Sequence, residues 1–402
     1  MNLRNYVYKY QFFTFALIMM IFAVQYILLM ADRGVEQAQA LIVLSVSQFL
    51  MMLAMLLITR IKGKIKYKNR IIQASFILRT VSVLLMFFTT NSTLFIALFL
   101  IFQISTAASY LFEGMIAQWS FNTKGSFGSF RAFFSFGIAV ATFVAAFIVN
   151  ITGDFNYLLL FALVLLIFNT IGALKYPVEI SDNEDENEQK KGLPLKFRFL
   201  LILGALAMAM SNAYVAHLNT HYMDVFGIPL ATTLTLAAIA MFIAAFVSEG
   251  SAFLTANKFV EKLTAKWVIF LGLALGMIRW FTVLISPNEI FFTATYLFHG
   301  FVFVFIYVGS LSYIKEKAGN EFTDKMVMEF TVFQLLIGIT MTQLINVVLS
   351  TFSYVYEGAI RFESIGYLTV IGIYIAVSFL ILLIYYFGYI FPEKRASNKR
   401  NS

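Results

Sequence analysis

Twelve long apolar runs, separated by short polar segments, occupy nearly all of this chain. Most hold about 20 residues or more, the length that an α-helix needs to cross a ~30 Å hydrocarbon layer. A transmembrane β-strand needs only ~10 residues and alternates in polarity, so runs of this length favour helices. The pattern predicts transmembrane helices at residues 10–31, 37–59, 71–89, 92–118, 132–150, 156–174, 197–222, 229–254, 267–285, 290–314, 327–350 and 365–391.

The amino-acid composition also indicates a membrane protein. Hydrophobic residues make up 60% of the 402 residues, charged residues only 12%, and the mean hydropathy is +0.83. A soluble domain carries about 25% charged residues, so we predict an all-α membrane protein with twelve transmembrane helices. The chain has no cysteine, which excludes disulfides and thiolate metal sites.

Lys and Arg residues fall in every second gap between the apolar runs. If the N-terminus is cytoplasmic, 25 of the 29 Lys and Arg residues lie in cytoplasmic segments, and only Arg33 and Arg361 lie on the opposite side. This bias follows the positive-inside rule and predicts that both termini are cytoplasmic. The net charge of +8 therefore reflects membrane topology, and we expect no nucleic-acid partner.

The longest polar stretch divides the predicted helices six and six. It contains SDNEDENEQKKG, which is acidic and poor in apolar residues, so we predict a flexible cytoplasmic linker at residues 175–196. Docking of a partner on its acidic run is an alternative. The predicted halves are residues 1–174 and 197–402.

The two halves also resemble each other in sequence. ASFILRTVSVLL in the third span is similar to ALGMIRWFTVLI in the ninth, which places Arg79 in register with Arg279. LFIALFLIFQ in the fourth span pairs in the same way with IFFTATYLFH in the tenth. Two six-helix parallel repeats around a central cavity resemble the arrangement of major facilitator transporters.

Two charges lie where the fourth and fifth predicted helices approach their shared turn. Glu113 and Arg131 are each nine residues from position 122, so on antiparallel helices they reach similar depth, roughly 13 Å from the turn. A carboxylate and a guanidinium at one depth can hold a polyhydroxylated ligand, because one accepts from hydroxyls and the other donates to them. A structural ion pair is the alternative that the spacing leaves open.

The segment EGMIAQWSFNTKGSFGSFRAFF resembles the fourth-to-fifth helix region of lactose permease and the oligosaccharide:proton symporters. That family has a Glu, then Phe-Gly-x-x-Arg, matched here by Glu113, Phe127, Gly128 and Arg131. The resemblance implies that Glu113 and Arg131 are the main contacts to substrate hydroxyls.

Three further ionisable residues follow in the order that this family shows. Glu249, Arg279 and His299 lie on the eighth, ninth and tenth predicted spans, within the motifs SEGSAFL, GMIRWF and YLFHGFVF. The resemblance implies that Glu249 links the substrate and proton sites and that Arg279 and His299 belong to the proton-coupling network. A cluster that only neutralises its own charges is the alternative, although charges inside a membrane are usually functional.

The chain also departs from the family at several of its functional positions. The carboxylate that carries the proton in the family is replaced by Val302, and its Lys by Tyr296. Its acidic positions on the seventh helix correspond to Ser211 and Tyr214, and its sugar-stacking Trp to Ile138. These differences leave lactose itself unsupported as the substrate and make the proton route unusual.

Other polar residues in the spans are weaker candidates. Glu329, one turn into the eleventh span, is an interfacial residue or a substitute proton site. Three arrangements are open for Arg79: its side chain faces the cavity, pairs with Glu113, or extends to the membrane surface. His217 and His221 are four residues apart and share one helix face. Two interpretations are open: the pair binds a metal ion, or both side chains are part of the polar lining of the cavity.

We predict a secondary active transporter that takes up an oligosaccharide, glycoside or nucleoside together with protons by alternating access. An efflux pump or facilitator for amphipathic compounds is the alternative, favoured by the many Phe residues. No Walker loop, nucleotide fingerprint or HExxH motif is present, so we expect neither enzymatic activity nor a cofactor. The use of Phe, Ile, Lys and Asn suggests an AT-rich bacterial genome, and we expect a monomer in the bacterial plasma membrane.

Overall fold

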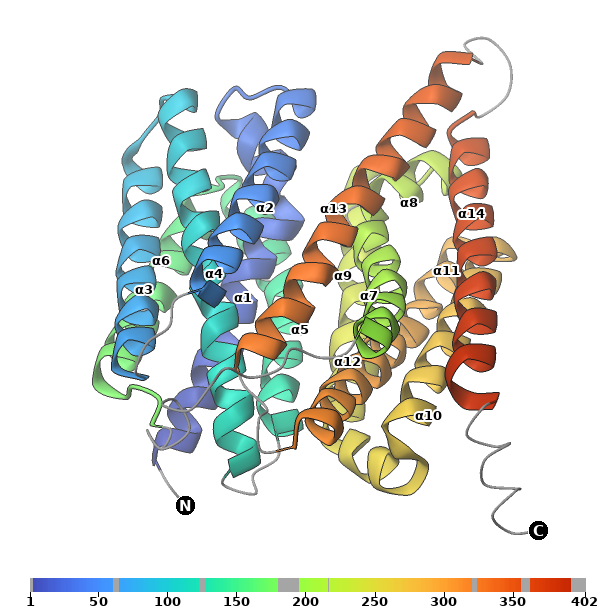
Figure 1. The fold of residues 1–402 in the computed structure, drawn as a ribbon. Coiled ribbons are helices and arrows are strands. Elements are labelled where there is room, and N and C mark those ends of the chain that lie inside the picture. Colours follow the sequence, from blue (N-terminus) through green and yellow to red (C-terminus); the bar gives the residue numbers. More distant parts are fainter. Residues whose placement is uncertain are drawn as a thin grey trace, which may run out of the picture. The chain divides into compact units, whose positions relative to one another are not determined.

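The first six predicted spans are each a single helix. The computed structural model describes residues 3–60, 65–122, 127–179, 195–215, 217–319, 324–355 and 362–391. Within a membrane the backbone must satisfy its own hydrogen bonds, which a continuous helix does. The helices are α1 (Leu3–Asp32), α2 (Gln37–Arg60), α3 (Ile65–Phe88), α4 (Ser92–Asn122), α5 (Phe127–Thr152) and α6 (Asn156–Lys175) (Figure 1).

The later spans are more often interrupted. The seventh is divided between two helices, and the eighth contains a π-helix, labelled η2. In order, the elements are α7 (Leu195–Val215), α8 (Leu218–Phe226), α9 (Leu230–Phe242), η2 (Ile243–Gly250), α10 (Ser251–Leu284), α11 (Glu289–Ala294), α12 (Tyr296–Ala318), α13 (Asp324–Val355), α14 (Phe362–Tyr385) and the π-helix η4 (Tyr386–Ile390).

The predicted fold class is confirmed. Among the described residues, 11 helical segments are long and apolar enough to cross a membrane, and α1 covers the remaining predicted span. No strand occurs in these residues. The chain is therefore an all-α, multi-pass membrane protein.

Helix packing repeats between the two halves. In the first, α2 and α3 pack on α4, and α3 also packs on α6. In the second, η2 and α10 pack on α12, and α10 also packs on α14. These are the second, third, fourth and sixth spans of each half, so the packing supports the predicted six-helix repeats.

Spatial clustering of the chain gives two units. The first comprises Met1–Gly192 and Glu321–Leu336, and the second comprises Leu193–Asn320 and Ile337–Ser402. The predicted linker begins at the end of α6, but its residues 180–194 lie outside the described part of the chain. The domain boundaries at 174 and 197 stay a prediction.

Glycine allows the closest helix contacts within each unit. A Cβ at Gly137 of α5 would overlap the carbonyl oxygen of Phe13 on α1, so no larger residue fits at this crossing. In the second unit a Cβ at Gly309 of α12 would lie 2.7 Å from Cγ1 of Ile269 on α10. Small residues of this kind let transmembrane helices approach closely and gain packing contacts.

The connection between the eighth and ninth spans differs from the prediction. The hydropathy pattern ends the eighth span at residue 254, but the helix continues and turns only at Thr264, whose φ of 66° is left-handed. Lys258 and Lys262 are good helix formers, so the helix persists after the lipid-facing segment has ended. Hydropathy marks the membrane boundary and not the helix end.

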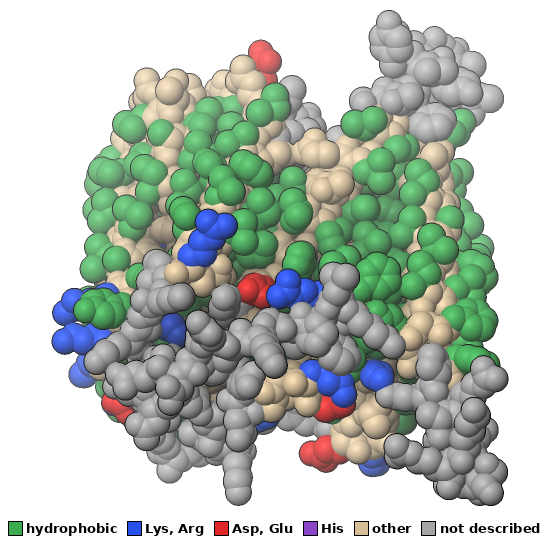
Figure 2. All heavy atoms as spheres, in the orientation of Figure 1, with side chains coloured by type: hydrophobic (Ala, Val, Ile, Leu, Met, Phe, Trp, Pro, Cys, Tyr) green, Lys and Arg blue, Asp and Glu red, His purple; other side chains and the backbone are tan. Residues whose placement is uncertain are grey.

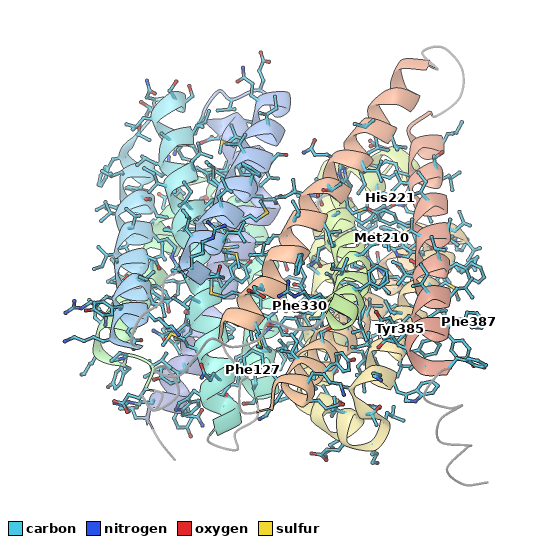
Figure 3. The ribbon with its side chains drawn as sticks, in the orientation of Figure 1. Phe127, Met210, His221, Phe330, Tyr385 and Phe387 are labelled. Carbon is cyan, nitrogen blue, oxygen red and sulfur yellow. The ribbon has the colours of Figure 1, made fainter. Side chains whose placement is uncertain are left out.

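Side chains distinguish the inner and outer faces of the helices. Apolar side chains cover much of the described surface in Figure 2, as expected for contact with lipid. In Figure 3, Phe387 projects outward and is 61% exposed, whereas Tyr385 points inward and donates a hydrogen bond to the carbonyl oxygen of Lys266 at 3.0 Å. The inward hydroxyl of Tyr385 thus has a protein partner.

Candidate functional site

The structure brings Glu113 of α4 and Arg131 of α5 together. Arg131 Nη1 donates to Glu113 Oε2 at 3.3 Å, and the residues are only 5% and 6% exposed. Strong charge-assisted N–H···O bonds measure about 2.7–2.9 Å. At 3.3 Å the contact between Glu113 and Arg131 is longer than this range.

A pocket in the first unit lies beside this pair. Glu113, Gln11 and Ser109 supply its polar lining, and five phenylalanines supply the rest. The pocket is narrow and has room for about one water molecule. The phenylalanines are Phe12, Phe15, Phe76, Phe112 and Phe134.

An aromatic ring also contacts the Arg131 side chain. Its guanidinium carbon lies 4.3 Å from the centroid of the Phe134 ring, which is part of the pocket wall. Cation–π contacts stabilise a guanidinium that has been removed from water. The polar lining and the ring faces together suit a solute that has both hydroxyl groups and an apolar face.

Arg79 of α3 lies next to the same aromatic wall. It is 1% exposed, and its guanidinium carbon is 4.2 Å from the Phe76 centroid and 5.3 Å from the Phe15 centroid. In the described part of the chain it forms no ion pair, so it does not pair with Glu113. Its burial also excludes extension to the protein surface.

The second unit contains a cluster of neutral polar groups around Arg279. This residue of α10 is fully buried and donates from Nη1 to Ser211 Oγ at 2.7 Å. Its guanidinium carbon lies 4.6 Å from the Trp280 ring and 5.2 Å from the Tyr296 ring. Among the described residues Arg279 forms no ion pair.

Tyr296 connects Arg279 with His299. The Tyr296 and His299 rings on α12 are stacked, with centroids 5.9 Å apart and an interplanar angle of 26°. Both side chains are buried. The structure therefore brings Arg279 and His299 to one cluster, with a tyrosine between them.

Glu249 lies on η2, directly beside the same part of α12. A Cβ at Gly300, the residue after His299, would be 2.5 Å from the backbone nitrogen of Glu249. The Glu249 side chain is buried, and it does not pair with Arg279. π-Helical turns within α-helices are frequent at functional sites, because they change the direction of side chains locally.

The remaining candidates are Glu329 and the histidines of the seventh span. Glu329 is half-buried on α13, in the segment grouped with the first unit. His221 Nδ1 is 2.7 Å from the hydroxyl of Tyr214, and its ring stacks on Phe292 at 4.2 Å. No group of three or more His, Cys, Asp and Glu residues in the described ranges could hold a metal ion.

Sequence reasoning missed most of the pocket wall and the partners of Arg279. Gln11, Ser109 and the phenylalanines carry no motif, because they meet only through packing of α1, α3, α4 and α5. Ser211 and Tyr296 were identified only as departures from the symporter pattern, and the sequence did not place them at Arg279. Their neutral side chains now surround the guanidinium of Arg279.

A sequence profile of the Major Facilitator Superfamily matches residues 10–341. The chain belongs to this superfamily of membrane transporters. A search of curated protein sequences finds no significant match.

Three solved structures illustrate the likeness in fold. A crystal structure of the nucleoside transporter NupG has a TM-score of 0.67 at 13% identity, with 96% of this chain and 100% of that chain covered. The E. coli fucose:proton symporter FucP has a TM-score of 0.61 at 12% identity, with coverages of 94% and 97%. The human organic anion transporter MFSD10 has a TM-score of 0.70 at 11% identity, with coverages of 96% and 100%. At these identities the likeness concerns the fold alone.

Proposed function

We propose that this transporter imports a small polyhydroxylated solute, such as an oligosaccharide, glycoside or nucleoside, by proton symport. The observation that carries the proposal is the buried pair of Glu113 and Arg131 beside the pocket in the first unit. The carboxylate would accept hydrogen bonds from solute hydroxyls and the guanidinium would donate to them. The transport activities named for NupG and FucP are compatible with this substrate class.

Proton coupling is assigned to the second unit. Glu249 would bind and release the proton, while Arg279 and His299 would make its proton affinity depend on the state of the transport cycle. The support is the burial of all three residues and the contact of η2 with α12 at Gly300. Glu329 is the reserve proton site.

Flux measurements on purified protein in liposomes test this proposal. Labelled sugars, glycosides and nucleosides are offered outside at acidic pH, with a more alkaline interior. One proton per solute and a gradient of about 1 pH unit can drive about tenfold accumulation. We expect accumulation of at least one such solute and its loss with a protonophore; flux that ignores the proton gradient would contradict symport.

Efflux or facilitated diffusion of amphipathic compounds is the second candidate. The five phenylalanines that line the pocket favour it, because ring faces bind apolar compounds without selecting hydroxyl groups. In the same liposomes, a facilitator would equilibrate such a compound and never concentrate it. Proton-driven accumulation inside inverted vesicles would identify an export pump.

The expected orientation has cytoplasmic termini in a bacterial plasma membrane. Two exposed positions test it in this cysteine-free chain: Glu36, between α1 and α2, and Lys66, in the first turn of α3. We expect an impermeant thiol reagent to label Glu36→Cys in intact cells and Lys66→Cys only after the membrane is opened. The reverse labelling pattern would show that the orientation is inverted.

A further inference from the structure

Arg79 is a buried guanidinium that the proposed hydroxyl site and proton path do not use. It lies on α3 in the first unit, over the rings of Phe76 and Phe15, and both rings line the pocket that contains Glu113. Isolated charge inside a membrane is costly and usually serves a function. The question is what balances this charge.

The charges around the pocket do not balance. Arg131 is paired with Glu113 and lies on Phe134, whose ring centroid is 5.8 Å from that of Phe15. The two guanidiniums therefore lie along one aromatic wall. Arg79 contacts the rings of Phe15 and Phe76 without itself lining the pocket. Glu113 is the one carboxylate among the described residues that line the pocket, and it pairs with Arg131, so no lining carboxylate balances the charge of Arg79. Cation–π contacts offset only part of the cost of burying it.

The two guanidinium nitrogens of Arg79 that lack a hydrogen-bond partner indicate which chemical group Arg79 can bind. Its Nε and Nη2 have no hydrogen-bond partner in the described part of the chain. These two nitrogens lie along one edge of the planar guanidinium. That edge can donate two parallel hydrogen bonds to the two oxygens of a carboxylate, a geometry that Arg favours and Lys cannot provide.

We propose that Arg79 binds an anionic group, specifically a carboxylate, of the transported solute. The preferred substrate is then a hydroxylated compound with an apolar face for the phenylalanine rings and one negative charge for Arg79. This inference rests on the proposed hydroxyl site at Glu113 and Arg131, and it narrows the substrate class from neutral glycosides to acidic ones.

A matched pair of probes tests the inference. Phenyl β-glucoside and phenyl β-glucuronide differ only at C6, where a CH₂OH group is replaced by a carboxylate. Titration calorimetry on the purified full-length protein measures both affinities. We expect the glucuronide to bind about ten- to a hundredfold more tightly, as for one hydrogen-bonded charge. Arg79→Gln should abolish this preference and leave the glucoside affinity unchanged.

Two further variants separate binding from structure. Arg70→Gln removes an exposed arginine from the same helix and should keep the preference. Arg79→Lys retains the charge without the planar edge and should give an intermediate preference. If Arg79 only supports Phe15 and Phe76, Arg79→Gln will lower the unfolding temperature without changing the ratio of the two affinities, and the inference is overturned.

The remaining outcomes are also decisive. Equal affinity of the wild type for both probes overturns this inference but leaves the proposed hydroxyl site standing, whereas binding of neither probe overturns this inference and excludes simple glycosides from the proposed substrate class. A free inorganic anion is the other source of negative charge. If chloride raises the unfolding temperature of the wild type but not of Arg79→Gln, and the glucuronide has no advantage, the anion does not belong to the solute.

Discussion

Replacement of Glu113 by Gln is expected to weaken binding of a hydroxylated substrate about ten- to a hundredfold, because a charge-assisted hydrogen bond contributes roughly 1.5–3 kcal/mol. Arg131→Lys should have an effect of similar size, since Lys keeps the charge but loses the planar fork. The buried 3.3 Å pair predicts that both changes act on one ligand site. The measurement is calorimetric affinity for whichever solute the liposome assay identifies.

Surface variants provide the controls for this experiment. Glu36→Gln and Arg60→Lys make the same chemical changes at exposed positions of the first unit and should leave the affinity unchanged. Correct folding of each variant is checked by its elution from a sizing column and by its unfolding temperature. Unchanged affinity in both site variants would mean that Glu113 and Arg131 form a structural pair.

The combined variant distinguishes a shared site from two independent ones. If Glu113 and Arg131 hold adjacent hydroxyls of one ligand, their effects are coupled and the double variant should lose less affinity than the two single effects predict. The residues already touch without ligand, so removal of Glu113 also leaves the buried Arg131 without this carboxylate. A lower unfolding temperature in Glu113→Gln than in Glu113→Gln combined with Arg131→Gln, which removes both charges, would reveal that contribution.

Hydropathy predicted the helices well but not where they end. The structure begins α1 at Leu3, whereas the apolar run begins at residue 10, and it continues the eighth span through charged residues as far as Thr264. Polar residues with good helix propensity extend a helix beyond the lipid. A transmembrane pattern contains no information about that extension.

The site was predictable only where it depends on spacing along the chain. Glu113 and Arg131 meet because α4 and α5 are joined by a short connection, so equal distances from the turn give equal depth. Gln11 and Phe76 come from α1 and α3, and no local pattern brings them to the pocket. Their convergence depends on helix packing, which sequence periodicity in all-apolar helices does not specify.

Departures from the family pattern proved informative in the second unit. Tyr296 and Ser211 stand where related symporters have charged residues, and both contact Arg279. Neutral partners of this kind leave a permanently charged guanidinium in a buried cluster. Glu249, on η2, packs against α12 at Gly300, the residue after His299. We therefore expect Glu249 to be the group that gains and loses a proton during transport.

Replacement of Glu249 by Gln is expected to abolish uphill accumulation while still allowing exchange of labelled for unlabelled substrate across the membrane. A coupling group must bind the proton at one stage and release it at another, and Gln cannot do either. A buried Glu can reach the required proton affinity through desolvation, and a nearby Arg can reverse that effect when the surroundings change. Val302 stands where the family has its usual carboxylate, so Glu249 and His299 are the remaining candidates to carry the proton.

The measurement compares two assays on the same liposomes. Accumulation driven by an imposed pH gradient should fall to the level of protein-free liposomes, and equilibrium exchange at equal pH should persist. Glu261→Gln, at an exposed position on α10, is the matched control and should retain both activities. Accumulation by Glu249→Gln at the wild-type level would reject this assignment, and Glu329→Gln and His299→Gln would then be tested in the same way. Loss of exchange as well as accumulation would place Glu249 in substrate binding or in the conformational change, because a pure coupling group is needed only for net proton movement.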